Sequence, residues 1–320
     1  TLYWVSHFLK FDFLASMGNF PYRDDDLSRK LLMFLTRRNL LAGCLSLPLL
    51  AEIGQAHERV AHRANLIGVS SYSFWQFRNE ELRDLEKNIE LAGSWGFDAF
   101  EILHRQMTDE SPAALQKLKR RALVNGLSLC GFSTHQTFVS PDPSERQKNI
   151  DHTIRCLEMA YALGIPTMRV NTGRWNTIKN FDELMKNRGI EPRLPGYTED
   201  DGFSWVIGSF EKLLPVAEKT GVVMGLENHW GLGLTAEGVL RVVDALKSPW
   251  LQVTLDTGNF LEEPILPKLE LLAEHAVLVQ AKTYYGGGIW YQLELDYPAI
   301  ASMLKKHHYK GFVSLVRKLR

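Results

Sequence analysis

The chain has 320 residues, of which 45% are hydrophobic, and its 37 basic residues balance 37 acidic ones. This length suits one large hydrophobic core and is too short for two of that size. The balanced charge excludes recruitment to nucleic acid or to an anionic membrane through bulk charge. We therefore expect a small-molecule ligand. The sequence does not decide between a monomer and a homo-oligomer.

Residues 1–64 have the features of a targeting segment rather than of a folded domain. Thr-Arg-Arg at 36–38 precedes an apolar run at 39–50, and the small-x-small pattern Gly-Gln-Ala follows at 54–56. This layout predicts a twin-arginine export signal, cleavage before His57, and a periplasmic or secreted protein. The alternative is a short amphipathic helix on a cytoplasmic protein, and the apolar run is too short to span a membrane.

Three cysteines, Cys44, Cys130 and Cys156, are scattered along the chain. Their spacing is not that of a zinc knuckle or of a disulfide framework, so we interpret them as structural. A bridge between Cys130 and Cys156 stays open for a protein outside the cytoplasm.

From residue 65 onward, short apolar runs alternate with longer amphipathic stretches, the pattern typical of βα units and a parallel sheet. Eight such runs predict a (β/α)8 TIM barrel over residues 65–320, with an open doubly wound sheet as the alternative. The predicted barrel leaves no residues for an eighth helix after the last strand. Several runs follow a glycine that we expect to end the preceding helix in a left-handed conformation. These glycines are Gly96, Gly126, Gly164, Gly221 and Gly311. The expected strands are 66–71, 97–103, 127–132, 167–171, 222–227, 251–256, 276–282 and 312–316.

The longest connection runs from about residue 172 to 202, after the fourth expected strand, and is rich in polar residues. Loops of this length are usually functional or disordered. Because it follows a strand on the face where barrel enzymes place their active sites, we interpret it as a lid.

Polar residues gather at the expected carboxyl ends of the strands, the side on which barrel enzymes bind their substrates. Aromatic rings at the same ends offer a surface for the apolar face of a sugar. From their positions in the strands we predict these substrate contacts: Trp75, Glu101, His104, His135, Asn171 and His229.

Glu227 and Asp256 end the fifth and sixth expected strands, which are neighbours in a barrel. Their carboxylate oxygens are placed to share a hard divalent cation such as Mg²⁺ or Mn²⁺. The alternatives are that each caps the helix that follows or pairs with Lys282.

The runs LENH at 226–229, LDTGN at 255–259 and VQAK at 279–282 resemble the strand five, six and seven signatures of the xylose isomerase-like superfamily of sugar isomerases and epimerases. The resemblance covers the chain from about residue 65 to the end and implies a TIM barrel. It also implies a divalent ion, Mn²⁺, Mg²⁺, Co²⁺ or Zn²⁺, held by Glu, Asp, His and Glu on strands five to eight. Glu227 and Asp256 match the first two of these ligands.

Two positions depart from that pattern. Gln280 stands where the family has histidine, and its amide oxygen binds a transition metal more weakly than imidazole does. Val316 stands where the second glutamate is expected, so the fourth ligand is missing.

The resemblance implies a metal-dependent isomerase or epimerase that acts on a sugar or polyol by moving a proton next to a carbonyl. We expect Glu227 as the catalytic base and Lys282 as its acid partner, with Glu101 as the alternative acid. The predicted metal ligands are Glu227, Asp256 and Gln280. The missing glutamate leaves an alternative, a catalytically impaired carbohydrate-binding barrel or truncated relative, while neutral charge and Gln280 disfavour the endonuclease branch of the superfamily.

Overall fold

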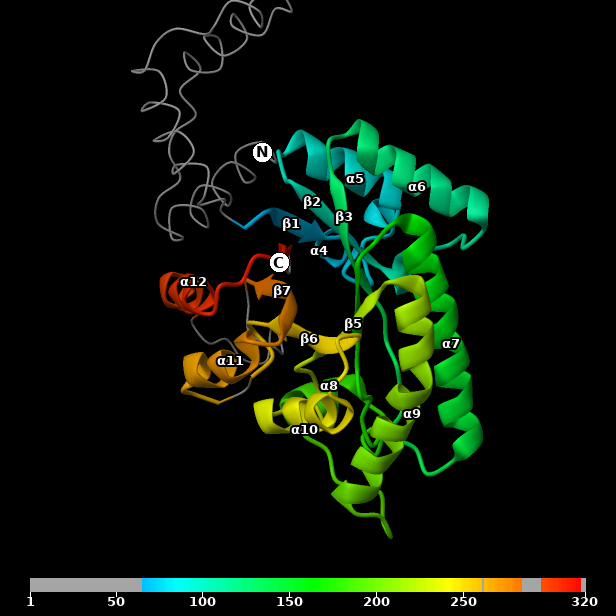
Figure 1. Cartoon of the computed structure of the whole chain (residues 1–320), viewed down its shortest axis with the longest axis vertical. Helices are drawn as coiled ribbons and strands as arrows, with labels where there is room; N and C mark the ends of the chain where they lie inside the picture. Colours follow the sequence, from blue (N-terminus) through cyan, green and yellow to red (C-terminus); the bar gives the residue numbers. More distant parts are fainter. Residues whose placement is uncertain (1–64, 261, 284–294, 318–320) are drawn as a thin grey trace, which may run out of the picture. The chain divides into compact units, whose positions relative to one another are not determined.

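The computed structural model describes residues 65–260, 262–283 and 295–317, which form the barrel shown in Figure 1. The predicted export signal, Cys44 and the cleavage site before His57 lie outside these residues. No helix in the described ranges is long and apolar enough to cross a membrane.

The parallel strands pair in chain order, and the last strand pairs with the first, so the sheet closes into a barrel. Ile67 in β1 (Ile67–Ser70) lies opposite Val313 in β8 (Val313–Val316), which excludes the open doubly wound sheet. Each run expected from the sequence overlaps one strand, which confirms the predicted barrel. The other strands are β2 (Ala99–Leu103), β3 (Ser128–Ser133), β4 (Thr167–Val170), β5 (Val223–Glu227), β6 (Leu251–Asp256) and β7 (Ala276–Lys282).

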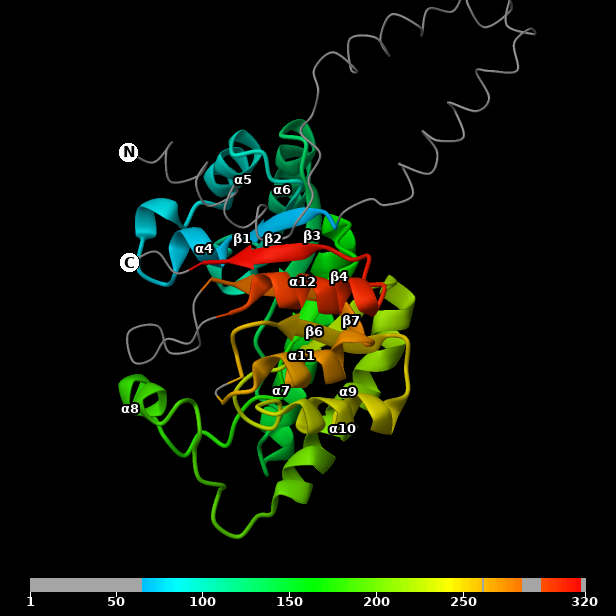
Figure 2. The same cartoon turned by 90° about the vertical axis from the view of Figure 1, so that its left-hand side faces the viewer.

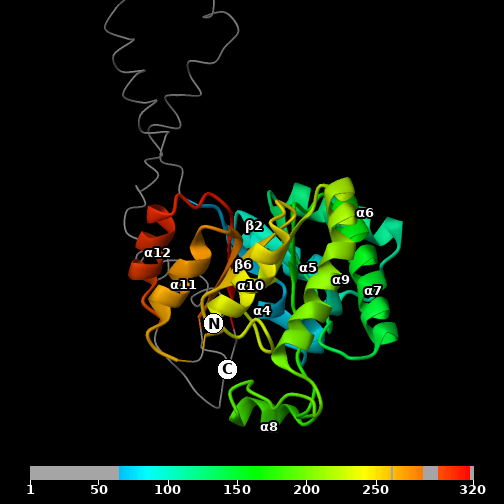
Figure 3. The same ribbon diagram turned by 60° about the horizontal axis from the view of Figure 1, so that its bottom comes forward.

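Long helices cover the outside of the barrel (Figures 1 and 3). They are α5 (Leu85–Ser94), α6 (Pro112–Val124), α7 (Pro143–Leu163), α9 (Glu199–Thr220), α10 (Ala236–Leu246), α11 (Ile265–Ala273) and α12 (Tyr297–Lys306). The shorter helices α4 (Tyr72–Trp75) and α8 (Phe181–Lys186) lie on the side toward which the strands point (Figure 2). Two 3₁₀ turns, η1 (Glu80–Leu82) and η2 (His104–Gln106), complete the connections after α4 and β2.

Local signals explain where several helices begin. The Asp84 carboxylate accepts hydrogen bonds from the main-chain N–H groups of Glu86 and Lys87 at the start of α5. Thr198 and Asp201 bind each other's main chain in a capping box at the start of α9. These side chains satisfy N–H groups that the first turn of a helix leaves without partners.

The expected helix-ending glycines are confirmed at all but one position. A left-handed φ between 67° and 76° occurs at Gly96, Gly126, Gly164 and Gly221. The expectation for Gly311 is wrong, because the left-handed residue after α12 is His308, with a φ of 53°. Gly311 is required by space instead, since a Cβ at this position would contact the Tyr309 ring.

The apolar stripes of the helices face the barrel, as their spacing predicts. On α5 the side chains of Leu85 and Ile89 are buried, while Leu82 at the end of η1 is half-buried. On α9 the buried stripe comprises Val206, Phe210, Leu213 and Ala217. Cys130 and Cys156 are buried and free, so the bridge that the sequence left open is not formed.

Candidate active site

A cavity of about 800 Å³ opens at the carboxyl ends of the strands. The residues after α4 and those of α8 form part of its wall, on the side where both helices lie (Figure 2). The volume suits a small molecule such as a sugar. The strand residues that line it are Ser70, Leu103, Ser133, Arg169, Glu227, Gln280, Lys282 and Val316.

Glu227, at the end of β5, is buried and fully engaged by donors. Its Oε2 accepts hydrogen bonds from Arg169 Nη1 at 2.7 Å and Asn171 Nδ2 at 2.8 Å, and its Oε1 accepts one from Asn259 Nδ2 at 3.1 Å. Burial favours the neutral acid, but the surrounding positive charges, chiefly that of Arg169, outweigh it and hold the pKa of Glu227 at about 2. The carboxylate is therefore ionised at neutral pH.

Asp256, at the end of β6, lies behind Lys282 as seen from the cavity. Lys282 lines the cavity, whereas Asp256 does not, and the ammonium Nζ lies 2.9 Å from Asp256 Oδ2. Burial raises the pKa of Asp256 to about 7, the nearby Glu227 charge adds to this, and the Lys282 charge opposes it. Lys282 also donates a hydrogen bond to Asn259 Oδ1, so one ammonium group links the two carboxylate clusters.

The predicted metal ligands are brought to one place, but each already has a partner within the protein. Glu227 is paired with the buried Arg169, Asp256 is paired with the partly buried Lys282, and the Gln280 amide nitrogen donates to Glu101 at 2.5 Å. The neighbouring position on β8 is the apolar Val316. A divalent ion would meet two resident cations and no fourth ligand, so these side chains do not fit such an ion while both ion pairs are formed.

Two of the predicted histidines line the cavity and are held in the neutral form. Burial, with the Arg169 and Arg105 charges nearby, keeps the pKa of His135 well below its ordinary value. Burial lowers the pKa of His229 to about 4, against the opposing effect of the Glu227 charge. A neutral ring has one donor and one acceptor nitrogen, and in His135 one ring nitrogen lies 3.2 Å from the Arg169 guanidinium, which can only donate.

The neutral state of His229 predicts a loss of stability in mild acid. The ring binds a proton at its ordinary pKa of 6.5 in the unfolded chain but only at about 4 in the folded one. The unfolded state binds more protons between these values, so the free energy of unfolding falls as the pH falls through this window, by at most about 3 kcal/mol. His229→Gln should therefore gain stability relative to the wild type as urea denaturation is repeated down this window. A difference that stays constant with pH would contradict the assignment.

Glu101 lies beneath the cavity rather than on its surface. Its side chain is fully buried, and its carboxylate accepts hydrogen bonds from the hydroxyls of Ser133 and Ser314 and from the Gln280 amide. Of the six predicted substrate contacts, His135, Asn171 and His229 line the cavity, and Glu101 does not. From this position Glu101 can orient the Gln280 amide, but it does not contact a substrate in the cavity.

His104 and Trp75 also lie away from the cavity lining. The Trp75 indole donates a hydrogen bond to Glu80 at 3.1 Å, and its ring packs under the Arg83 guanidinium. The next residues, Gln76 and Phe77, turn into the cavity with left-handed φ values of 53° and 59°. His104 projects from η2 toward α7, because the 3₁₀ turn that begins at this residue redirects the chain after β2.

The long connection after β4 is folded onto itself and forms one wall of the cavity. The Glu191 carboxylate binds Arg174 at 2.6 Å and accepts the N–H groups of Asn176 at 2.7 Å and Ile178 at 3.2 Å. The α8 residues that line the cavity are Phe181, Asp182, Leu184 and Met185. The segment thus lies where a lid would lie, and its closure stays a prediction.

Arg169 and Asn259 are site residues that the sequence interpretation did not single out. Arg169 lies inside β4 and is 6% exposed, and a charged residue in a short apolar strand is seldom buried without a partner. That signal was present in the TMRV run. Asn259 stood in the LDTGN run, where only Asp256 was assigned a role.

Residues 89–318 match the family model described as the xylose isomerase-like TIM barrel. The chain belongs to this family. Among curated proteins it is 26% identical over 224 residues to the 3-oxo-isoapionate decarboxylase of Pectobacterium atrosepticum, and the match covers 68% of each protein.

Solved structures of two epimerases share the fold. D-psicose 3-epimerase from Clostridium cellulolyticum, crystallised with D-tagatose, is 19% identical with a TM-score of 0.62 and covers 79% of this chain and 85% of that one. The apo 3-keto-D-glucoside 4-epimerase of E. coli is 18% identical with a TM-score of 0.62, over 80% of this chain and 93% of that one. At these identities the likeness establishes the fold of this chain.

Proposed function

We propose that this chain is an isomerase or epimerase that acts on a sugar- or polyol-derived carbonyl compound by moving a proton next to the carbonyl. The observation that carries the proposal is a set of two ion pairs, the buried pair of Glu227 with Arg169 and the partly buried pair of Asp256 with Lys282, beside a sugar-sized cavity. Family membership and the epimerases of the same fold support this chemistry.

In the proposed reaction, Lys282 and Asp256 supply a proton to the substrate oxygen, and Glu227 with Arg169 removes the proton from carbon. Lys282 faces the cavity, so it can give a proton to the substrate oxygen, and Asp256 with a pKa of about 7 can replace that proton near neutral pH. Glu227, with a pKa of about 2, is a weak base while Arg169 binds it. It becomes a stronger base when the substrate carbonyl draws the Arg169 guanidinium away, and the same guanidinium then stabilises the negative charge on the carbonyl oxygen until Lys282 protonates that oxygen to give the enediol.

The charges around the cavity favour a substrate that carries an acidic group. Basic side chains in its lining are Arg78, Arg105, Arg169, Arg174 and Lys282, against the acidic Asp182 and Glu227. Arg105 has no carboxylate within ion-pair distance in the described part of the chain. Burial and the Arg169 charge lower the pKa of the Arg105 guanidinium, and a bound anion would relieve both effects.

This excess of positive charge also favours a second candidate function, the decarboxylation of a keto sugar acid. Loss of CO₂ from such an acid produces the same enolate as proton removal, so Arg169 and Lys282 would stabilise it in the same way. The curated relative is named for a reaction of this class.

Solvent exchange distinguishes these functions. We expect the purified protein, in deuterium oxide with a panel of ketoses and keto sugar acids, to place deuterium next to the carbonyl and to form an epimer or isomer, both visible by NMR. Release of CO₂ would identify a decarboxylase instead. Neither product from any compound that binds would contradict both proposals and favour a carbohydrate-binding barrel.

Arg105→Met should raise the KM for acidic substrates by about tenfold or more, the cost of one charged hydrogen bond, with little change in kcat. Arg105→Lys, which keeps the charge, is the control, and neutral ketoses should be unaffected by either change.

Metal dependence and export are finer proposals that rest on the sequence. The ion pairs of Glu227 and Asp256 do not favour a divalent ion, so the metal content of the wild type against Asp256→Asn tests that part. Export to the periplasm rests on residues 36–56 alone.

A further inference from the structure

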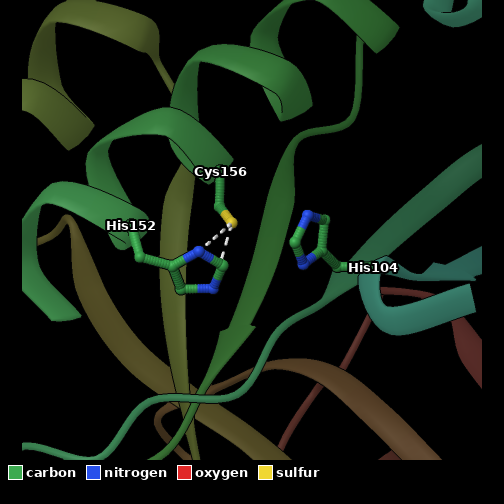
Figure 4. A group of neighbouring side chains, drawn as sticks. All are labelled: His104, His152 and Cys156. Atoms are coloured by element: carbon green, nitrogen blue, oxygen red, sulfur yellow. Dashed lines mark hydrogen bonds between the residues drawn. The ribbon is translucent and has the colours of Figure 1, made fainter. Parts of the chain in front are cut away.

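Three side chains able to bind a metal meet outside the cavity, between η2 and α7 (Figure 4). His152 and Cys156 are four residues apart on α7 and share one face of the helix, and His104 points toward them from the start of η2. One ligand atom from each residue lies within 4.8 Å of the others. None of the three lines the cavity, so the cluster is separate from the ligands predicted at the barrel centre.

We propose that His104, His152 and Cys156 bind a Zn²⁺ ion that ties the loop after β2 to α7. The Cys156 sulfur lies 3.6 Å from His152 Nε2. Tetrahedral zinc, with Zn–S of about 2.3 Å and Zn–N of about 2.0–2.1 Å, holds a sulfur and a nitrogen ligand about 3.6 Å apart. Two of the three ligand atoms therefore already have the separation that the ion requires.

The third ligand, His104, has a partner that suits a metal-bound histidine. Glu110 Oε1 lies 2.8 Å from His104 Nε2, and the His104 and His152 ring centroids are 5.2 Å apart. Carboxylates commonly orient metal-bound histidines or complete the coordination sphere, and Glu110 is half exposed and free to do either. Binding of the ion requires the His104 ring to move toward His152 and Cys156, because the three ligand atoms now lie within 4.8 Å of one another rather than at tetrahedral spacing.

The donor atoms select the kind of ion. A thiolate with two imidazoles suits Zn²⁺ or Co²⁺ and disfavours Mg²⁺ and Ca²⁺, which prefer oxygen. Cys156 is fully buried, so its thiol is shielded from reagents in solution, and a role as an exposed nucleophile does not fit. Metal binding would displace the thiol proton into solution.

The ion would act on the cavity through the main chain. His104 is followed directly by Arg105, which lines the cavity. An ion that fixes His104 to α7 would restrict η2 and with it the position of the Arg105 guanidinium. The zinc site would thus restrain one wall of the cavity, independently of the reaction that takes place there.

Metal binding tests the proposal without any substrate. The full chain is stripped with a chelator and dialysed against Zn²⁺, and we expect about one equivalent to bind and to raise the melting temperature. Loaded with Co²⁺ instead, it should show a thiolate-to-cobalt charge-transfer band together with the intense visible bands of a tetrahedral site. The zinc-dependent rise in melting temperature and the cobalt charge-transfer band should disappear in Cys156→Ser and persist in Cys130→Ser, which changes another buried cysteine.

A second pair of variants separates this site from the barrel centre. Asp256→Asn should retain the bound zinc, whereas His104→Ala, at a partly exposed position that is less sensitive for folding, should lower zinc affinity at least tenfold. Zinc retained in Cys156→Ser, zinc lost only in Asp256→Asn, or no zinc bound by the wild type would each overturn the proposal. These results do not depend on the outcome of the isomerase assays.

Discussion

Glu227→Gln is expected to lower turnover by about 10²- to 10⁴-fold, the range found when an acid–base group is removed. The carboxylate accepts three hydrogen bonds beside the cavity. In the described strands, no other acidic side chain accepts hydrogen bonds from both Arg169 and Asn171. The same change leaves the Arg169 guanidinium buried without its carboxylate. The free energy of unfolding should therefore fall by about 3–5 kcal/mol.

Two controls separate the lost chemistry from the lost stability. The double variant Glu227→Gln with Arg169→Gln removes both charges, so it should regain much of the stability and none of the turnover. Glu101→Gln makes the same substitution at a buried carboxylate that does not line the cavity, and its turnover should stay within about tenfold of the wild type. Turnover is measured with the best substrate of the exchange panel, at a temperature where each variant is folded by circular dichroism. Equal losses in the two single variants would show that Glu227 has no special role.

The barrel could be predicted from the sequence because its signals are local. Apolar runs such as LQVTLD mark each βα unit, and left-handed glycines mark four of them, without reference to any distant residue. Gly311 shows the limit of this approach: its small size is needed against the Tyr309 ring, and only the folded chain shows that contact.

The candidate site could be predicted only in part. Strand order places Glu227, Asp256 and Lys282 at one end of the barrel, and the sequence identifies all three. Which group pairs with which depends on side-chain directions across several strands, so the pairing of Arg169 with Glu227 was not foreseen. His104 was misplaced for a related reason: η2 begins at this residue and directs it outward to α7, although it directly follows β2.

Lys282→Met is expected to make the stability of the protein depend steeply on pH. Asp256 already has a pKa of about 7 against an ordinary value of 3.8, because burial outweighs the Lys282 charge. Without the ammonium group this pKa rises further, so the folded state holds the proton more tightly than the unfolded state does. Stability contributed by the protonated acid is present at low pH and is lost as the pH rises through the folded pKa.

Urea denaturation of the wild type and of Lys282→Met, in mildly acidic and in alkaline buffer, measures this effect. The variant should lie close to the wild type in acid and lose about 3–5 kcal/mol in alkali, where a buried carboxylate without a partner must ionise. Adding Asp256→Asn should remove the pH dependence, because no acid remains to titrate. Lys268→Met, at a lysine whose ammonium donates a hydrogen bond to the exposed main-chain oxygen of Glu262, should show no such slope. If Lys282→Met were equally destabilised in both buffers, Asp256 would not be the titrating partner. The proposal that Asp256 replaces the proton that Lys282 gives to the substrate would then also be wrong.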